Sequence, residues 1–254
     1  MPRTATRSRT PLGQAAGTAP AEAGAPRGPS GEERPLDLTA TAYEQLRASI
    51  LRGQLRPGDK LAAEMLRQRF NFGSTPIREA LNRLLAEGWV ALEAKKGFRV
   101  APVTEQELNE LVTARSWIDG AAVTEAVRRR DLHWEENLLI ALHRLSRAVR
   151  RPSGRSSDNA EWEQRHRQFH QALVSGCGTQ WIMRISQQLF DAAERYRLLA
   201  ADEVPERDEL DEHRAIVDAC LAADAPLAID LLTRHYSATS EVIAKALHAD
   251  PRRG

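Results

Sequence analysis

The sequence predicts a mainly α-helical protein, with a small N-terminal unit of helices and a strand hairpin followed by a C-terminal all-α bundle of about six helices. Three observations support this class. Apolar residues recur at helical spacing in three short segments before residue 88. Two short strand-like runs follow between residues 89 and 103. From Thr104 onward, every segment has a helical pattern.

Composition narrows the class of protein. The 254 residues are 42% apolar and 28% charged, which is ordinary for a soluble globular protein and leaves room for two domains. No apolar run reaches the roughly 18–20 residues of a membrane span, and the N-terminus lacks the apolar core of a secretory signal. Cys177 and Cys220 are too few for a disulfide framework, so we expect a cytoplasmic protein in which they are small core residues.

Charge divides the chain into two parts. Residues 39–103 carry eleven Lys and Arg against six Asp and Glu, whereas residues 104–254 carry 20 against 25. A basic unit followed by an acidic one predicts that only the first meets a polyanion. Residues 1–37 are rich in Ala, Pro, Gly, Arg and Thr, lack large apolar residues, and are expected to be a disordered tail.

The elements of residues 38–103 follow from local signals. Tyr43, Leu46 and Ile50 predict a first helix that ends at Gly53. "RPGD" is a turn, a second short helix covers about residues 64–70, and "NFG" turns the chain again.

A third helix is expected to begin with Thr75 as its N-cap and Pro76 at its first helical position, and to end before Gly88. "WVALEA" and "GFRVAPV" then predict two strands joined through "KKG", residues 95–97. Three helices and a hairpin in this order are the plan of a winged helix-turn-helix.

A DNA-reading face lies on the third helix. If Ile77, Leu81 and Leu84 are buried, polar side chains gather on one side near the N-terminal end, which is the end that enters the major groove in such motifs. The lysines at the wing tip would reach the neighbouring backbone or minor groove. A solvated helix face is the alternative, but the whole arrangement favours DNA binding. The candidate residues are Ser74, Thr75, Arg78, Asn82, Lys95, Lys96 and Gly97.

The bundle is predicted from breaks between helical segments. "RPSGRSSD", "SGCG" and "DAP" have turn chemistry and separate most of the helices. The expected helices cover about residues 104–130, 131–150, 159–175, 179–200, 207–223 and 225–248.

Four histidines of this bundle form a candidate metal site. In "HRQFHQAL", His166 and His170 are four residues apart and project to one side of a helix. His213 and His235 lie at similar distances before and after the turn at residues 224–226, so an antiparallel helix pair would place them side by side. Imidazole suits zinc, nickel, copper or iron. The alternative is a cluster of satisfied core histidines. The other histidines, His133, His143 and His248, lack such partners and are expected to be surface or structural residues.

Motifs in both halves carry a family resemblance. "LRPGDKL" and "STPIREALNRLLAEGWVALEAKKGFRV" resemble the DNA-binding domain of GntR-type bacterial regulators. The helical remainder resembles the FCD ligand-sensing domain of their FadR-like branch. "HRQFHQALVSGCGTQWI" and "LFDAAERYR" resemble the carbon-starvation-induced (CsiR-like) group. The domains implied are 1–37, a tail; 38–103, a winged helix-turn-helix; and 104–254, an FCD-like sensing and dimerisation domain.

The resemblance assigns further roles. FCD domains often hold a divalent metal with an Asp-x-x-x-His pair and two more histidines. His170, His213 and His235 match these histidines, whereas His166 stands in place of the acid. An all-nitrogen set favours zinc, with nickel as the second choice. Arg115, in "LNELVTARSWIDG", matches the arginine that faces the ligand, where a guanidinium can hold a carboxylate through two parallel bonds. Arg195 and Arg197 in "ERYR" are further candidates.

The DNA-reading helix departs from the family pattern. Gly73-Ser74 replaces the usual Ser-Arg, and Glu64 replaces an arginine of the preceding helix. Fewer arginines therefore reach the bases, and no known operator sequence can be carried over. Arg78 matches the family's "REAL" arginine and remains the first candidate for base or phosphate contact.

The predicted function is a metabolite-responsive transcriptional regulator, most often a repressor in this family. A homodimer would bind a pseudo-palindromic operator in double-stranded DNA. The effector class is a small organic acid, either a C4–C5 dicarboxylate or a hydroxy-acid. Two alternatives remain open. One is a metal-dependent hydrolase or lyase, for which no general base in a known motif is found near the histidine pair. The other is an effector-independent DNA-binding protein with a structural metal.

Overall fold

The computed structural model describes residues 35–150, 159–200 and 209–249 of the chain. Most of the expected tail therefore lies outside the described residues, as does the expected loop at 151–158. The tail predicted for residues 1–37 is three residues too long, because helix α1 already begins at Pro35. Proline is favoured at the first helical position, since its missing N–H would have no intrahelical partner there.

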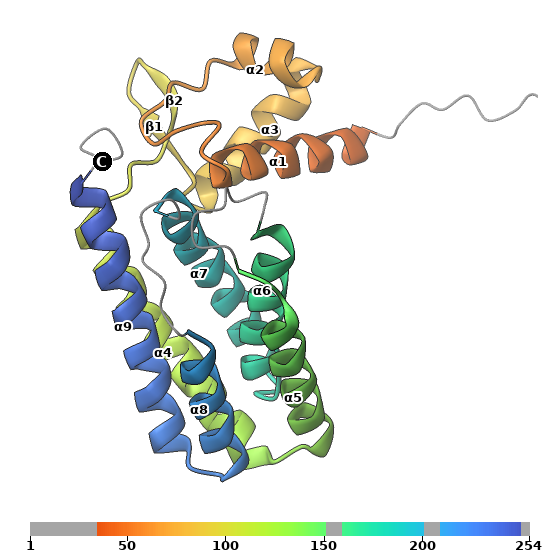
Figure 1. The fold of residues 1–254 in the computed structure, drawn as a ribbon. Helices are drawn as coiled ribbons and strands as arrows, with labels where there is room; N and C mark the ends of the chain where they lie inside the picture. Colours follow the sequence, from red (N-terminus) through yellow and green to blue (C-terminus); the bar gives the residue numbers. More distant parts are fainter. Residues whose placement is uncertain (1–34, 151–158, 201–208, 250–254) are drawn as a thin grey trace, which may run out of the picture. The chain divides into compact units, whose positions relative to one another are not determined.

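The first part has the predicted elements in the predicted order. Antiparallel pairing in the hairpin runs from Val90 opposite Val100 to Glu93 opposite Gly97. The elements, shown in Figure 1, are α1 (Pro35–Leu51), α2 (Ala63–Phe70), α3 (Ser74–Ala86), β1 (Val90–Glu93) and β2 (Gly97–Val100). The prediction of a winged helix-turn-helix is thus confirmed.

Helix α3 begins earlier than expected. Its N-cap is Gly73, not Thr75, and no side chain caps it. Pro76 consequently lies within the first turn, where it is tolerated because the N–H groups of that turn have no intrahelical partners. The apolar stripe is as predicted, with Ile77, Leu81 and Leu84 fully buried.

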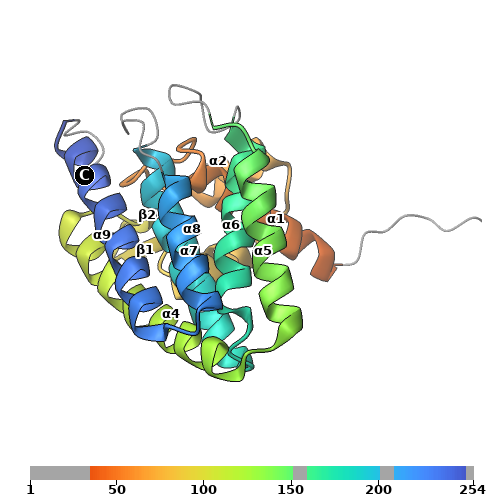
Figure 2. The same ribbon diagram turned by 60° about the horizontal axis from the view of Figure 1, so that its bottom comes forward.

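The remaining described elements are helices that pack into a bundle. Figures 1 and 2 show them side by side, with α4 along α9 and α8 also against α9. Side chains cap the N-terminal ends of α4, α5 and α9, the last through Asp224, whose carboxylate accepts from the N–H of Leu227. The Thr104 hydroxyl accepts from the N–H of Glu107, and the Asp131 carboxylate accepts from the N–H groups of His133 and Trp134. The helices are α4 (Glu105–Arg129), α5 (Leu132–Arg147), α6 (Ala160–Ser175), α7 (Gln180–Leu199), α8 (Glu209–Leu221) and α9 (Ala225–Ala249).

The bundle core surrounds α6. Phe169 and Leu173 of α6 are fully buried within a cluster to which α4, α5, α8 and α9 contribute. Cys177 and Cys220 are free and buried in the same cluster, as predicted, and burial raises the pKa of the Cys220 thiol to about 12. Gly176 allows a close approach, because a Cβ atom there would lie 2.8 Å from Trp134. Across the described residues, no helix combines the length and apolar character that a membrane crossing needs.

Candidate functional site

The four predicted histidines meet inside the bundle. His166 and His170 come from α6, His213 from α8 and His235 from α9, and all four are buried. One ligand atom from each ring lies within 4.8 Å of the others. The Nε2 atoms of His166 and His170 are 3.1 Å apart, and the ring centroids of His213 and His235 are 4.6 Å apart. The antiparallel helices α8 and α9 therefore place His213 and His235 side by side, as their similar distances from the turn predicted.

Burial keeps the two α6 histidines neutral. It lowers the pKa of His166 and of His170 well below the usual value, and the neighbouring histidines add to the effect. The Nδ1 atoms of both rings are buried and have no hydrogen-bond partner among the described residues. A buried polar atom left unpaired costs about 1–3 kcal/mol. A neutral imidazole with a free lone pair is the form that binds a transition metal, so the donor set fits a zinc or nickel ion.

A carboxylate orients the fourth histidine. The Nδ1 atom of His235 lies 2.8 Å from Oε2 of Glu212, so its Nε2 atom is directed toward the other rings. Histidines that bind metals almost always place the second ring nitrogen against a carboxylate, carbonyl or water in this way. Sequence reasoning did not identify Glu212 as a partner of His235. Its position next to His213 gives no sign that it serves a histidine on another helix.

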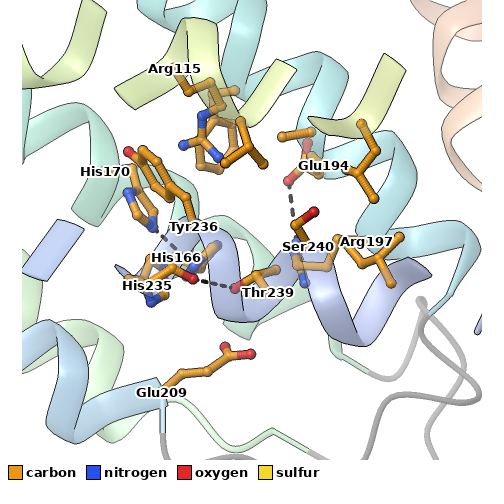
Figure 3. A pocket seen from close by; sticks show the side chains of 15 residues that line it. Arg115, His166, His170, Glu194, Arg197, Glu209, His235, Tyr236, Thr239 and Ser240 are labelled. Atoms are coloured by element: carbon orange, nitrogen blue, oxygen red, sulfur yellow. Dashed lines mark hydrogen bonds and ion pairs between the residues drawn. The ribbon is translucent and has the colours of Figure 1, made fainter. Parts of the chain in front are cut away.

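Arg115 borders the same cavity. Its side chain, on α4, is 7% exposed, and its guanidinium lies 3.9 Å from the ring centroid of Tyr236. Nε is 3.8 Å from Oδ2 of Asp119, and within the part of the chain that the structure describes neither Nε nor Nη2 has a hydrogen-bond partner. Figure 3 shows Arg115 and Tyr236 next to His170. A buried cation with unused donors beside a cluster of imidazoles can receive an anion.

Asp119 and Tyr236 are site residues that sequence reasoning missed. Asp119 is buried and accepts hydrogen bonds from the Tyr236 hydroxyl at 2.7 Å and from the Ser186 hydroxyl at 2.5 Å. Burial raises the pKa of Tyr236 far above its usual value, so the phenol remains a donor. These partners come from α4, α7 and α9, so no local pattern could have indicated them.

The two arginines of "ERYR" have different positions. Arg197 lines the histidine cavity, but its guanidinium already binds Glu163 and approaches Glu194. Arg195 is absent from the lining residues of that cavity and donates to the carbonyl of Ala101. The expectation that Arg195 helps to hold an effector is therefore wrong. Its side chain leaves α7 in another direction, toward the segment that precedes α4.

The candidate DNA-binding residues lie on the surface. Ser74, Thr75, Arg78 and Asn82 are exposed on α3, on the side opposite its buried stripe. Lys95 and Lys96 are exposed at the hairpin tip, where Lys95 and Gly97 have positive φ angles of 63° and 86°. Within the described part of the chain, Arg78 makes neither a hydrogen bond nor an ion pair, so its guanidinium is available to a partner. The expected surface histidines, His133, His143 and His248, are exposed.

Comparison with protein families matches both halves of the chain. Residues 38–100 match the bacterial regulatory proteins of the gntR family, and residues 110–238 match the FCD domain. These ranges coincide with the winged helix-turn-helix and with the bundle that contains the four histidines.

Individual proteins similar to this chain are also transcriptional regulators. The chain is 34% identical over 211 residues to the HTH-type transcriptional repressor GlaR of Escherichia coli (strain K12), covering 81% of this chain and 95% of that protein. It is also 34% identical over 211 residues to the uncharacterized HTH-type transcriptional regulator BphR of Paraburkholderia xenovorans (strain LB400), covering 81% and 85%.

Solved structures show the same fold. McbR/YncC of E. coli superposes with a TM-score of 0.66 at 20% identity, covering 82% of this chain and 97% of that one. A GntR regulator from Rhodococcus sp. RHA1 has a TM-score of 0.63 at 22% identity, covering 84% and 98%. With an exposed reading helix and wing on one domain and a helical FCD bundle as the other, the chain belongs to the GntR family of bacterial transcriptional regulators.

Proposed function

We propose that this regulator is a repressor controlled by a small organic acid that binds at a metal-containing site in the FCD bundle. His166, His170, His213 and His235 hold a divalent ion, zinc in the first place and nickel in the second. The acid, a dicarboxylate or a hydroxy-acid, binds next to the ion and to Arg115. A homodimer reads a pseudo-palindromic operator in double-stranded DNA.

One observation carries the proposal: four buried imidazoles have ligand atoms within 4.8 Å of one another. Two of these rings have buried Nδ1 atoms without partners, and burial disfavours the charged form of both. Four buried imidazole rings this close need a cation or extensive hydrogen bonding to be stable, because buried polar groups left unpaired are costly. When bound, the ion supplies a positive centre that attracts a carboxylate.

Arg115 is the protein's own contribution to acid binding. Its unused Nε and Nη2 donors border the cavity that the histidines line. A carboxylate accepts two parallel hydrogen bonds from a guanidinium, and the contact of Arg115 with the Tyr236 ring, 3.9 Å from its centroid, helps to hold the planar group in place. Regulation then requires the acid to prefer one state of the protein, and by linkage the operator disfavours the acid to the same extent.

The carboxylates around the cavity argue against a hydrolase. Glu194 is paired with Arg167 and approaches Arg197, and Glu209 lies 2.9 Å from Arg150. A general base should be free to take a proton from a bound water. Among the described residues that line the cavity, the two glutamates are held in ion pairs instead.

The proposal is tested on the zinc-loaded full chain. Fluorescence anisotropy with operator DNA should fall toward the value of free DNA when C4–C5 dicarboxylates or hydroxy-acids are added, and thermal unfolding should shift upward with the same acids. Removal of the ion with a chelator should abolish both responses. Acid binding that survives complete metal removal, or an operator complex that ignores every acid, would refute the proposed mechanism.

A prediction about the dimer follows from an exposed apolar surface. Trp117 on α4 is 73% exposed and Trp181 on α7 is 70% exposed, on two helices that pack against each other. Buried tryptophans at interfaces typically contribute about 2 kcal/mol or more. We expect Trp117→Asp to convert the dimer to monomers in sedimentation experiments and to weaken operator binding.

Leu139→Asp is the matched control, because Leu139 is an exposed apolar residue of a different helix, α5. This variant should remain a dimer. If Trp117→Asp and Leu139→Asp sediment alike as dimers, the interface lies on another surface of the bundle.

A further inference from the structure

A second cavity lies beside the histidine cavity. It has a volume of about 360 Å³ and is lined by residues of α4, α5, α6 and α7. The histidine cavity measures only about 40 Å³, which is space for about three water molecules at ~10–15 Å³ each. The two cavities share three lining residues, Arg115, His170 and Phe190. We call the larger one the amide cavity, after the Asn137, Gln171 and Gln187 side chains that line it.

Buried polar groups form the floor of the amide cavity. Arg115, Asp119, His170 and Ser186 are all buried there. Asp119 is occupied by the hydroxyls of Ser186 and Tyr236. Arg115, in contrast, keeps two donor nitrogens without partners although its side chain is more than nine-tenths buried. The floor thus presents a desolvated cation that lies 3.8 Å from Asp119 and still has two donors without a hydrogen-bond partner among the described residues.

The rim of the amide cavity is polar but uncharged. Asn137, Gln171 and Ser175 are exposed there, and Gln187 is half-buried. Gln171 donates to Gln187, which in turn donates to Asp191 at 2.8 Å. Side-chain amides offer both donors and acceptors, so they can bind a hydroxyl or an amide equally well. Among the described residues that line this cavity, Arg115 carries the only positive charge, and Asp119 lies beside it.

Size and charge together define a ligand. A volume of about 360 Å³ lies within the roughly 300–1,000 Å³ typical of small-molecule sites, whereas the histidine cavity is too small for a C4–C5 acid. A carboxylate that reaches Arg115 therefore leaves the rest of its molecule in the amide cavity. A second carboxylate at the far end of this cavity, away from both the ion and Arg115, would have no cation beside it among the described lining residues.

We propose that the amide cavity binds the body of the effector, and that this body is an uncharged tail with hydroxyl or amide groups on a single carboxylate. The proposal rests on the proposed function, because it assumes that an acid binds at Arg115. Of the two effector classes in the proposed function, this cavity favours the hydroxy-acid over the dicarboxylate. Arg115 receives the carboxylate, and the amides of Gln171, Gln187 and Asn137 exchange hydrogen bonds with the tail.

Calorimetry on the zinc-loaded full chain tests the chemistry of the tail. Pentanoate, glutaramate and glutarate share a five-carbon chain with a carboxylate at one end. The other end is a methyl group in pentanoate, an amide in glutaramate and a second carboxylate in glutarate. We expect glutaramate to bind about tenfold more tightly than the other two, as one or two added hydrogen bonds would give. Gln171→Leu should remove most of the difference between glutaramate and pentanoate. Pentanoate or glutarate binding as tightly as glutaramate would overturn the proposal.

A filled cavity tests the location of the tail. Ser175 lines the amide cavity but not the histidine cavity, and its hydroxyl bonds only within α6, to the carbonyl of Ala172. Ser175→Trp should weaken glutaramate at least tenfold while leaving acetate and zinc affinity unchanged. Ser175→Ala, which adds no bulk, should bind like the wild type. Unchanged zinc affinity also shows that the tryptophan variant is folded.

The outcomes separate this inference from the proposed function. If Ser175→Trp binds glutaramate as the wild type does, the tail lies elsewhere, while an acid-responsive metal site still stands. If the zinc-loaded protein binds none of the acids, acetate included, then both the proposed function and the amide-cavity assignment are wrong.

Discussion

Replacing His170 with alanine is expected to abolish tight metal binding and, with it, the response to acids. His170 is buried, its Nε2 lies 3.1 Å from that of His166, and its ring borders both the histidine cavity and the amide cavity. Loss of a residue that only supports a ligand lowers metal affinity by about 10–100-fold, so loss of a ligand itself should cost more. Zinc affinity by competition with a chelating dye gives the first measurement.

Thermal unfolding and operator binding complete this test. The acid-induced rise in unfolding temperature should disappear in His170→Ala, whereas affinity for operator DNA in the absence of acid should be preserved. His133→Ala, on the exposed surface of α5, is the matched control and should behave like the wild type in every assay. A His170→Ala protein that still releases DNA when acid is added would place the sensing site elsewhere.

Replacing Arg78 with alanine is expected to weaken operator binding by about 1–3 kcal/mol, or roughly 5–150-fold, and to relax the base preference at one position of each half-site. Arg78 is exposed on α3 and makes no ion pair or hydrogen bond within the described residues. Such an arginine can bind guanine bidentately in the major groove. Binding is measured on operators with single base changes and at several salt concentrations, because phosphate contacts show a stronger salt dependence.

Arg83→Ala is the control on the same helix. The Arg83 guanidinium already bonds Glu87 at 3.0 Å and stacks on Tyr43 at 3.7 Å from the ring centroid, so it is engaged within the protein. This variant should lose little operator affinity. If it loses as much as Arg78→Ala, with no change in base preference for either variant, α3 contacts the DNA only through its general positive charge.

Local chemistry made most of the fold predictable. Asp131 was expected near a helix start and does cap α5 with its carboxylate, and the stripe of Ile77, Leu81 and Leu84 is buried as its spacing indicated. The start of α3 was misjudged by two residues because Thr75-Pro76 has the chemistry of a helix start, whereas the chain already becomes helical at Ser74 after an uncapped Gly73. Helix ends are decided by small energies, so tertiary packing can move them.

The candidate site was predictable only in part. His166 and His170 share a helix face through their spacing, and a short turn aligns His213 with His235, so two near-local relations sufficed to predict four residues. The partners of Asp119, which lies beside Arg115, could be found only from the fold. Tyr236 and Ser186, which bond Asp119, lie 117 and 67 residues away from it along the chain.

By itself, the sequence determined the order of the elements, the division into a basic reading unit and an acidic bundle, and the four histidines, because periodicity, turn chemistry and charge act over a few residues. Only the tertiary structure decided that Glu212 orients His235, that Arg197 is already paired and that Arg195 turns away. It also decided that a large cavity with an uncharged rim adjoins Arg115. Such relations depend on the packing of helices that are distant in sequence, and the free volume between them depends on every side chain that lines it.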